Sequence, residues 1–373
     1  MKLRHVTGIA ALLATICVAS AADWKVLPHG GRDYVTFANV AEFYHFGEFS
    51  QASRIVSLQG EHRGIRAQAD TSELYINGVR FFTNYPIVTE ANESMISATD
   101  VGKIIEPVLR PSKIQGAHNV DTVVLDPGHG GTDQGTASRF GTEKAFALDV
   151  AMTAREQLLR AGFKVEMTRT TDVGLPLDER VDFANRFPNA VLVSIHFNSA
   201  SGGAGVESYA LAAEGVASNA TPGENHSSAM DVLRNPGNEQ DQQNVALTAA
   251  VHAAVLSRTS AFDRGVRHSR FKVLRNARVP ALLLEGGFLS DATEGQRIAT
   301  SEYRQRLGTA IAQGVQAYNA AVNYRSGNAN TTFAAVRANL PPHARSITEP
   351  LSASQAIQPP PPEEPSVSID AGK

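Results

Sequence analysis

Cysteine is almost absent from this chain: Cys17 is the only one among 373 residues. A single cysteine excludes an intramolecular disulfide, and it excludes a metal site built from several thiolates, so a metal would need nitrogen and oxygen ligands. An excess of basic residues is also lacking. Lys and Arg number 34 against 37 Asp and Glu, a formal charge of −3, so nothing points to a nucleic-acid partner.

Long apolar runs are lacking too, except near the start. The run GIAALLATICVAS at 8–20 follows Lys2 and Arg4 and leads into the small residues ASAAD. It is too short to span a bilayer, and the pattern predicts a signal peptide at 1–22 that is cleaved off. Cleavage would remove Cys17 and two positive charges, taking the formal charge from −3 to −5. We therefore expect an exported protein with no disulfide and no membrane attachment after cleavage.

The C-terminal end lacks apolar periodicity. Residues 324–373 are rich in Pro, Ser and Asn and include the stretch QPPPPEEPSVSIDAGK. Such a segment has too few apolar residues to form a core, so we predict a disordered Pro-rich tail.

Residues 23–112 have the pattern of a small α+β domain. The stretch ELYINGVRFF predicts a hairpin, because an Asn-Gly pair separates two short alternating strands. RDYVTFANVAEFYHF predicts a strand and a short helix, and ISATDVGKIIEPVLRP predicts a helix that begins at Ser97 or Thr99 and ends near Pro107. PSKIQGAHNV is a plausible linker to the next domain.

Residues 118–323 alternate strands with helices. The predicted strands are TVVLD, FKVEMTR, AVLVSIHF, GVESYAL, FKVLR and ALLLEGGF. EKAFALDVAMTAREQLLRAG and YRQRLGTAIAQGVQAY carry apolar residues every four positions, as in amphipathic helices. Several strands are continuously apolar, which is typical of a sheet covered on both faces. The fold class predicted for this part is α/β, a mostly parallel sheet flanked by helices.

Four polar residues stand where ligands bind in such a fold, outside the carboxyl ends of the strands. His129 follows VVLD, His196 follows VLVSI, Glu285 follows ALLL, and Glu143 opens the helix after the glycine-rich loop. Two histidines and one carboxylate form a catalytic zinc set with an open position, and the other carboxylate is then free to move protons. Taken singly, a histidine at a strand end is more often structural, and Glu143 suits the first turn of a helix.

Further segments of the same region resemble one protein family. LDPGHGGTDQGT, Glu143, TRTTDVGLPLDERVDFAN, SIHFNS and VPALLLEGGFLSD resemble, in order, the zinc-dependent N-acetylmuramoyl-L-alanine amidases of the amidase 3 family. The resemblance implies that His129, Glu143 and His196 bind one zinc ion and that Glu285 is the catalytic carboxylate. It also implies a peptidoglycan substrate, a location in the periplasm or at the cell wall, and a protein activator for some members.

Two functional alternatives remain open. One is a wall-binding protein that keeps the metal without turnover, which the intact Glu285 disfavours, and the other is a zinc peptidase or deacetylase. Residues 213–243 form a long polar insert that we interpret as a groove wall or lid rather than an autoinhibitory arm. The N-terminal domain resembles the domain found at the N-terminus of copper amine oxidases and implies no copper.

Other polar residues receive structural interpretations. We expect Asp126 to shape the loop beneath the metal site and Arg180 to form a structural ion pair. His252 shares a helix face with apolar residues and is expected in the core, whereas His268 is expected at the surface.

Overall fold

The computed structural model describes residues 24–200, 202–219 and 232–324. The predicted signal peptide and nearly all of the predicted tail lie outside these ranges, as do residues 220–231 of the insert. Within them, no helix is both long and apolar enough to cross a membrane.

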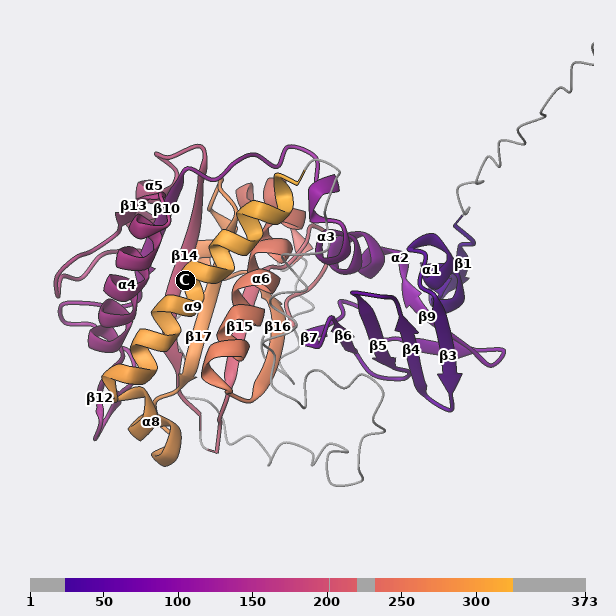
Figure 1. Ribbon diagram of the computed structural model, residues 1–373, viewed down its shortest axis with the longest axis horizontal. Helices are drawn as coiled ribbons and strands as arrows, with labels where there is room; N and C mark the ends of the chain where they lie inside the picture. The colour runs from indigo at the N-terminus through magenta and orange to yellow at the C-terminus, as the bar shows by residue number, and fades with distance from the viewer. Residues whose placement is uncertain (1–23, 201, 220–231, 325–373) are drawn as a thin grey trace, which may run out of the picture.

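The central element is a mixed sheet that runs through most of the described chain (Figure 1). Its strands, in spatial order, are β13 (Lys164–Met167), β10 (Thr122–Pro127), β14 (Ala190–Asn198), β17 (Ala281–Phe288), β15 (Val206–Leu211), β16 (Asp263–Ser269), β7 (Val79–Phe82), β6 (Glu73–Ile76), β5 (Gly64–Gln68), β4 (Ile55–Gln59) and β3 (Glu48–Ala52). From β13 to β17 all pairings are parallel, whereas β15 pairs antiparallel with β17 and parallel with β16.

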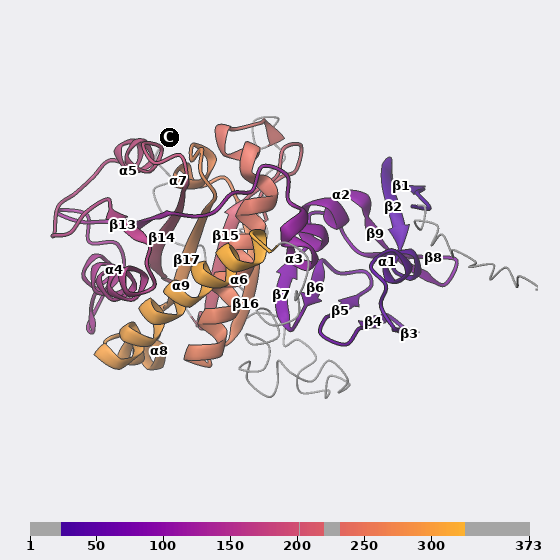
Figure 2. The same ribbon diagram turned by 45° about the horizontal axis from the view of Figure 1, so that its top comes forward.

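Helices cover both faces of the parallel part of the sheet. On one face lie α4 (Glu143–Arg160), α6 (Asp241–Thr259) and α9 (Ser301–Val322), and on the other lie α5 (Leu177–Ala184) and α7 (Lys272–Arg275) (Figure 2). A further helix, α8 (Ala292–Ile298), precedes α9. A hydrophobic core lies on each face of the sheet, and alternate residues of β10 point into one or the other. Val123 and Leu125 pack under α4 and α9, whereas Val124 packs under α5. The predicted architecture of a sheet flanked by helices is confirmed.

One predicted strand is wrong. FKVLR was expected to be a strand, but its residues from Lys272 to Arg275 form helix α7, and the strand β16 lies just before them in DRGVRHS. A short apolar run fits one turn of a buried helix as well as a strand, and here packing against α5 and β17 selects the helix.

The N-terminal region adds strands to the same sheet. Strands β3 to β7 are antiparallel to one another, and β7 pairs with β16 of the α/β region through Phe81 and Val266. Their core includes Val245 and Ala249 of α6, so the two regions share buried surface. A second sheet packs nearby, formed by β1 (Leu27–His29), β2 (Arg32–Thr36), β9 (Glu93–Ser97) and β8 (Val88–Glu90). The domain boundaries expected at 112 and 118 stay a prediction.

Local predictions in this region are largely confirmed. Asn77 and Gly78 connect β6 and β7 with positive φ angles, as a two-residue hairpin turn requires. Helix α1 (Phe37–Phe43) follows β2. Ser97 caps the next helical stretch, whose segments are α2 (Ala98–Asp100), a π-helical turn η1 (Val101–Ile105) and α3 (Glu106–Leu109). The stretch passes Pro107, which sits in the first turn of α3, where its missing N–H is tolerated.

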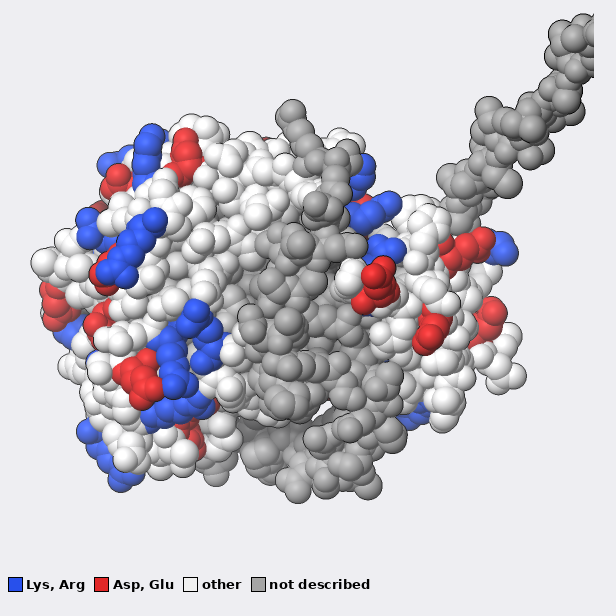
Figure 3. All heavy atoms as spheres, viewed as in Figure 1, with Lys and Arg blue, Asp and Glu red and all other residues white. Residues whose placement is uncertain are grey.

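The outer face that carries α4 and α9 has mixed charge. Basic and acidic side chains lie interspersed between broad uncharged areas (Figure 3). This face therefore presents no continuous basic surface among the described residues.

Candidate metal centre

The sheet topology places the four predicted site residues at one edge. His129 follows the end of β10, and His196 lies near the end of β14, which is hydrogen-bonded to β10. Glu285 lies on the next strand, β17, as the register partner of His196. Glu143 is the first residue of α4, which is connected to β10 by the glycine-rich loop. Three adjacent parallel strands and one helix start therefore bring these residues together, at the carboxyl ends of the strands, where polar residues following apolar runs were expected to meet.

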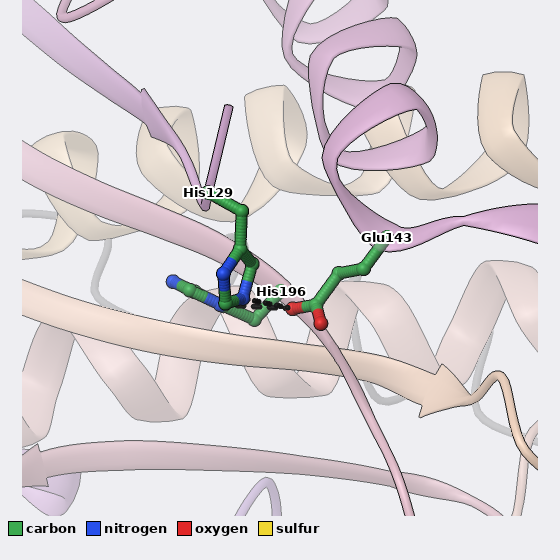
Figure 4. A group of neighbouring side chains, drawn as sticks. All are labelled: His129, Glu143 and His196. Carbon is green, nitrogen blue, oxygen red and sulfur yellow. Dashed lines mark hydrogen bonds and ion pairs between the residues drawn. The ribbon is translucent and has the colours of Figure 1, made fainter. Parts of the chain in front are cut away.

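His129, Glu143 and His196 form one compact donor group (Figure 4). Their candidate ligand atoms all lie within 4.8 Å of one another. Glu143 Oε1 lies 3.0 Å from His129 Nε2 and 2.9 Å from His196 Nδ1. The two imidazole rings are nearly perpendicular, at 80°, with centroids 5.0 Å apart. Both rings thus present a nitrogen to the same carboxylate oxygen.

The carboxylate of Glu143 is held in place by backbone donors as well. Phe197 N donates to Oε1 at 3.0 Å, and Thr136 N donates to Oε2 at 2.8 Å. Burial opposes ionisation, but the hydrogen bonds and charges of His129 and His196 outweigh it and hold the pKa of Glu143 well below its usual value. The group is therefore a carboxylate at neutral pH, the form that binds a metal.

His129 is oriented by an acid that the sequence analysis missed. Asp133 Oδ2 lies 2.7 Å from His129 Nδ1, so the other ring nitrogen, Nε2, faces Glu143. Burial lowers the pKa of His129, but the hydrogen bonds to Glu143 and Asp133 outweigh burial and raise it. A carboxylate on the far nitrogen of a metal-binding histidine is a common arrangement that fixes the ring. The available signal was an acid four residues after His129 in the same loop.

Glycine at two loop positions lets the donor group come together. A Cβ at Gly128 would overlap the ring of His196, and a Cβ at Gly135 would lie 2.5 Å from Glu143 Oε2. His129 itself has φ of 59°, in the left-handed backbone region that residues other than glycine seldom occupy. The loop turns tightly, as expected. At Gly128 the missing side chain leaves space for the ring of His196.

Two buried arginines hold the loop from below. Arg169 donates to Pro127 O at 2.9 Å and to Gly128 O at 2.7 Å, and Arg180 donates to Pro127 O at 2.8 Å and to His129 O at 2.7 Å. These carbonyls would otherwise be buried without donors, at a cost in stability. The arginines thus fix the backbone from which His129 projects.

Arg180 is itself paired with Asp126, as the sequence analysis expected for both residues. Arg180 Nη1 donates to Asp126 Oδ1 at 2.8 Å, and both side chains are buried. Burial opposes ionisation of Asp126, but attraction from Arg180 and hydrogen bonds from Thr168 and Ser194 outweigh it and lower the pKa. Asp126 therefore acts on the metal site through the arginine that holds its loop.

We expect Asp126→Asn to lower the free energy of unfolding by about 3–5 kcal/mol at pH 7, because one charge of a buried pair loses its partner. Since the pKa of Asp126 is lowered in the folded state, its contribution is complete above about pH 4, the usual aspartate value, and is lost as the pH falls through the lower folded value. Urea unfolding of the wild-type and Asp126→Asn proteins between pH 7 and pH 3 measures this difference in the free energy of unfolding.

A matched control is Asp149→Asn, which breaks the half-exposed pair between α4 and Arg304 of α9 and should cost less than about 1 kcal/mol. An Asp126→Asn protein as stable as this control would show that the buried pair does not support the loop.

Glu285 is a buried carboxyl group beside the donor group. It is 7% exposed, and its Oε2 has no hydrogen-bond partner among the described residues. Burial, with the negative charges of Glu143 and Glu207, raises the pKa of Glu285 well above its usual value. Glu207, which the sequence analysis also missed, is the register partner of Glu285 on β15. An unpartnered buried acid is costly, so its position next to a metal donor group indicates a functional role.

Two other histidines can now be placed. His252 is fully buried on α6 and lies 2.8 Å from Ser208 Oγ and 2.9 Å from Asp263 Oδ1, which confirms a core position. His268 was expected at the surface, and this is wrong: it is 2% exposed on β16 beside Ala210. Burial lowers its pKa to about 4, so it is neutral in the core. The sequence segment around it did not predict a central strand, which is why its burial was missed.

The donor group suits zinc. Tetrahedral zinc with ligands at about 2.0–2.1 Å places neighbouring ligand atoms about 3.3 Å apart. The separations of 3.0 Å and 2.9 Å at Glu143 Oε1 are a few tenths of an ångström shorter, so small side-chain movements would admit the ion. Two imidazoles and one carboxylate also leave a coordination position for a reactant.

Comparison with known proteins identifies the family of this chain. Residues 123–317 match the protein family described as N-acetylmuramoyl-L-alanine amidase, amidase 3. The sporulation-specific N-acetylmuramoyl-L-alanine amidase of Bacillus subtilis strain 168 is 30% identical over 208 residues, which are 55% of this chain and 71% of that protein. The N-acetylmuramoyl-L-alanine amidase AmiA of Escherichia coli K12 is 29% identical over 217 residues, 52% of this chain and 75% of that protein.

A solved structure matches a similar share of the chain. The catalytic domain of CwlV, an N-acetylmuramoyl-L-alanine amidase from Bacillus (Paenibacillus) polymyxa var. colistinus, is 29% identical, covers 53% of this chain and 98% of its own, and has a TM-score of 0.44. The family match spans more than half of the chain and includes His129, Glu143, His196 and Glu285. The chain is therefore an enzyme and belongs to the amidase 3 family of N-acetylmuramoyl-L-alanine amidases.

Proposed function

We propose that this enzyme is a zinc-dependent peptidoglycan hydrolase. It cleaves the amide between N-acetylmuramic acid and the L-alanine of the stem peptide, in cell-wall remodelling or cell separation. The observation that carries the proposal is the donor group of His129, Glu143 and His196 with the unpartnered carboxyl group of Glu285 on the adjacent strand. Family membership supplies the substrate class.

The three donor residues would hold one zinc ion per chain. His129 would bind through Nε2, because Asp133 occupies Nδ1, and Glu143 and His196 would complete the set. Bound zinc supplies a Lewis acid that polarises the scissile carbonyl and lowers the pKa of water to about 7. Asp133, Arg169 and the backbone donors to Glu143 keep these side chains in position before substrate arrives.

Glu285 would carry out the proton transfers. Burial, with the negative charges of Glu143 and Glu207, raises the pKa of Glu285, which makes its carboxylate a stronger base than an exposed one. It takes a proton from the attacking water, whose oxygen bonds to the carbonyl carbon. When the carbon–nitrogen bond breaks, Glu285 gives that proton to the amine of L-alanine, which leaves as the free N-terminus of the stem peptide. The burial of Glu285 limits competition from bulk water for the proton.

The cell location and partners follow the same proposal. We infer that the predicted signal peptide takes the enzyme to the periplasm or the cell wall, where its partner is peptidoglycan. The protein activator and the resemblance of the N-terminal region to the copper amine oxidase N-terminal domain stay predictions. The interpretation of residues 213–243 as a groove wall or lid rather than an autoinhibitory arm also stays a prediction; the described parts, 213–219 and 232–243, lead into the first turn of α6.

The test is mass spectrometry of purified peptidoglycan digested with residues 23–373. We expect intact stem peptides that begin with L-alanine, together with glycan strands that carry free lactyl carboxylates. Protein dialysed against a chelator should give neither product, and added zinc should restore both. Peptides cut at internal bonds would indicate a peptidase, loss of acetyl groups would indicate a deacetylase, and zinc-loaded protein without any product would indicate a binding protein.

A further inference from the structure

A row of polar side chains leads away from the metal centre across the sheet. His196, Glu285 and Glu207 are register partners on β14, β17 and β15, so their side chains lie on the same face. Arg264 of β16 continues the row, because its Nε donates to Glu207 Oε2 at 3.0 Å. With strands about 4.8 Å apart, the backbone of β16 is roughly 14 Å from that of His196.

Glu207 is an anchor for this row rather than a free group. It is 4% exposed. Its Oε1 accepts hydrogen bonds from Asn198 Nδ2 at 2.6 Å and from Tyr209 OH at 2.8 Å, and its Oε2 accepts from Arg264. With both oxygens engaged, Glu207 has little capacity left for a substrate, but it fixes the guanidinium of Arg264.

Arg264 is arranged for binding a planar anion. Its guanidinium lies over the ring of Phe288, with the central carbon 4.7 Å from the ring centroid. Its Nε is bonded to Glu207, and among the described residues its two terminal nitrogens have no hydrogen-bond partner. The side chain is 28% exposed, so solvent reaches it. Because this guanidinium is already held at Nε and over a ring, it loses little further conformational freedom when a carboxylate binds its outer edge.

The charge around Glu207 is positive. Arg267 Nε lies 3.7 Å from Glu207 Oε2, so one carboxylate faces two guanidiniums. Arg267 is the more buried of the two, at 11% exposed, and it donates to Asn219 O at 3.3 Å. This group of one carboxylate and two guanidiniums thus has a net positive charge, and Arg264 is its more exposed cation.

An apolar surface adjoins the exposed guanidinium. Phe262 is 64% exposed, the highest value among the large apolar side chains of the described residues. It flanks Gly205 together with Arg264, since a Cβ at Gly205 would lie 3.0 Å from the side chain of each. A positive group beside an aromatic ring can contact both the charged and the aliphatic parts of a peptide.

We propose that Arg264 is a specificity-determining residue that binds a free carboxylate of the stem peptide near the scissile amide. The inference rests on the proposed function. Arg264 reaches back to Glu207, whose strand is about 10 Å from that of His196, and an extended peptide covers that distance in about three residues. The carboxylate bound is thus one carried by the first three residues of the stem peptide.

The experiment compares two synthetic muropeptides with the same tripeptide stem, one with free carboxylates and one with carboxamides. For the wild-type enzyme, kcat/KM should be roughly 10- to 100-fold higher on the carboxylate form, mainly through KM, as expected for a charge-assisted bidentate contact. Arg264→Gln should bring this ratio close to one. Arg264→Lys, which keeps the charge beside Glu207 but not the planar fork, should give an intermediate ratio.

The matched control is Arg155→Gln, which removes the same charge from an exposed position on α4 and should keep the wild-type ratio. Zinc content and thermal unfolding, measured on the same preparations, separate a loss of recognition from a loss of fold. A wild-type ratio near one, or a ratio preserved in a folded Arg264→Gln protein, would overturn the inference while leaving the amidase function intact. Wild-type enzyme that cleaves neither muropeptide would overturn the proposed function and this inference with it.

Discussion

Glu285→Gln should keep its zinc and lose turnover by roughly 10²–10⁴-fold, the usual contribution of a positioned acid–base group. Glutamine preserves the shape of the side chain in its buried position but cannot accept the proton of the attacking water. Glu285 is not a member of the donor group formed by His129, Glu143 and His196, so metal content should not change. KM should change less than kcat, because the proton moves only in the transition state.

The measurement is the rate on a soluble muropeptide, with zinc determined by atomic spectroscopy on the same preparations. Glu166→Gln, at an exposed position on β13, is the matched control and should retain the wild-type rate. A Glu285→Gln enzyme near the wild-type rate would make the proposed proton transfers wrong, even with zinc in place. If it lost zinc while Glu143→Ala retained it, the roles of the two glutamates would be exchanged.

Replacing any of the three donor residues by alanine should abolish both zinc binding and activity. Zinc should fall from about one per chain to near none in His129→Ala, Glu143→Ala and His196→Ala, because two remaining protein ligands do not hold the ion tightly. Glu143→Ala has a further consequence, since Phe197 N and Thr136 N lose the carboxylate that accepts from them. Activity should fall below that of Glu285→Gln, which keeps the metal.

Metal content after dialysis, and activity with and without added zinc, decide this prediction. His62→Ala removes a surface imidazole of the N-terminal region and should leave zinc and activity unchanged. Full zinc retention in both His129→Ala and His196→Ala would remove the assignment of these residues as ligands. Thermal unfolding of the variants without metal would show whether the loop itself has been disrupted.

The predictable part of the site came from residue types at the ends of apolar runs. His129, His196 and Glu285 each follow, within a few residues, a run long enough to be a buried strand, and parallel strands bring such positions to one edge. Their partners were less visible. The only local signal for Asp133 was its place four residues after His129, and Glu207 carries no local pattern that separates it from an ordinary acid. Their importance comes from tertiary contacts: Asp133 lies 2.7 Å from His129, and Glu207 is the register partner of Glu285.

The fold shows the same division. The alternation of strands and helices determined a sheet covered by helices, because periodicity and apolar runs are properties of short segments. The orientation of β15, the helix at α7 and the burial of His268 were decided by tertiary structure, since each depends on which strand lies alongside. The join of β7 to β16 also pairs residues far apart in the chain.

By itself, the sequence predicted a group of nitrogen and oxygen donors at one edge of an α/β sheet, because composition and motif order are written along the chain. Only the tertiary structure decided how that group is held: which ring nitrogen of His129 faces Glu143, which arginines satisfy the loop carbonyls, and which guanidinium Glu207 holds. These are contacts between side chains from different strands, and their distances depend on strand order and register, which no local pattern specifies.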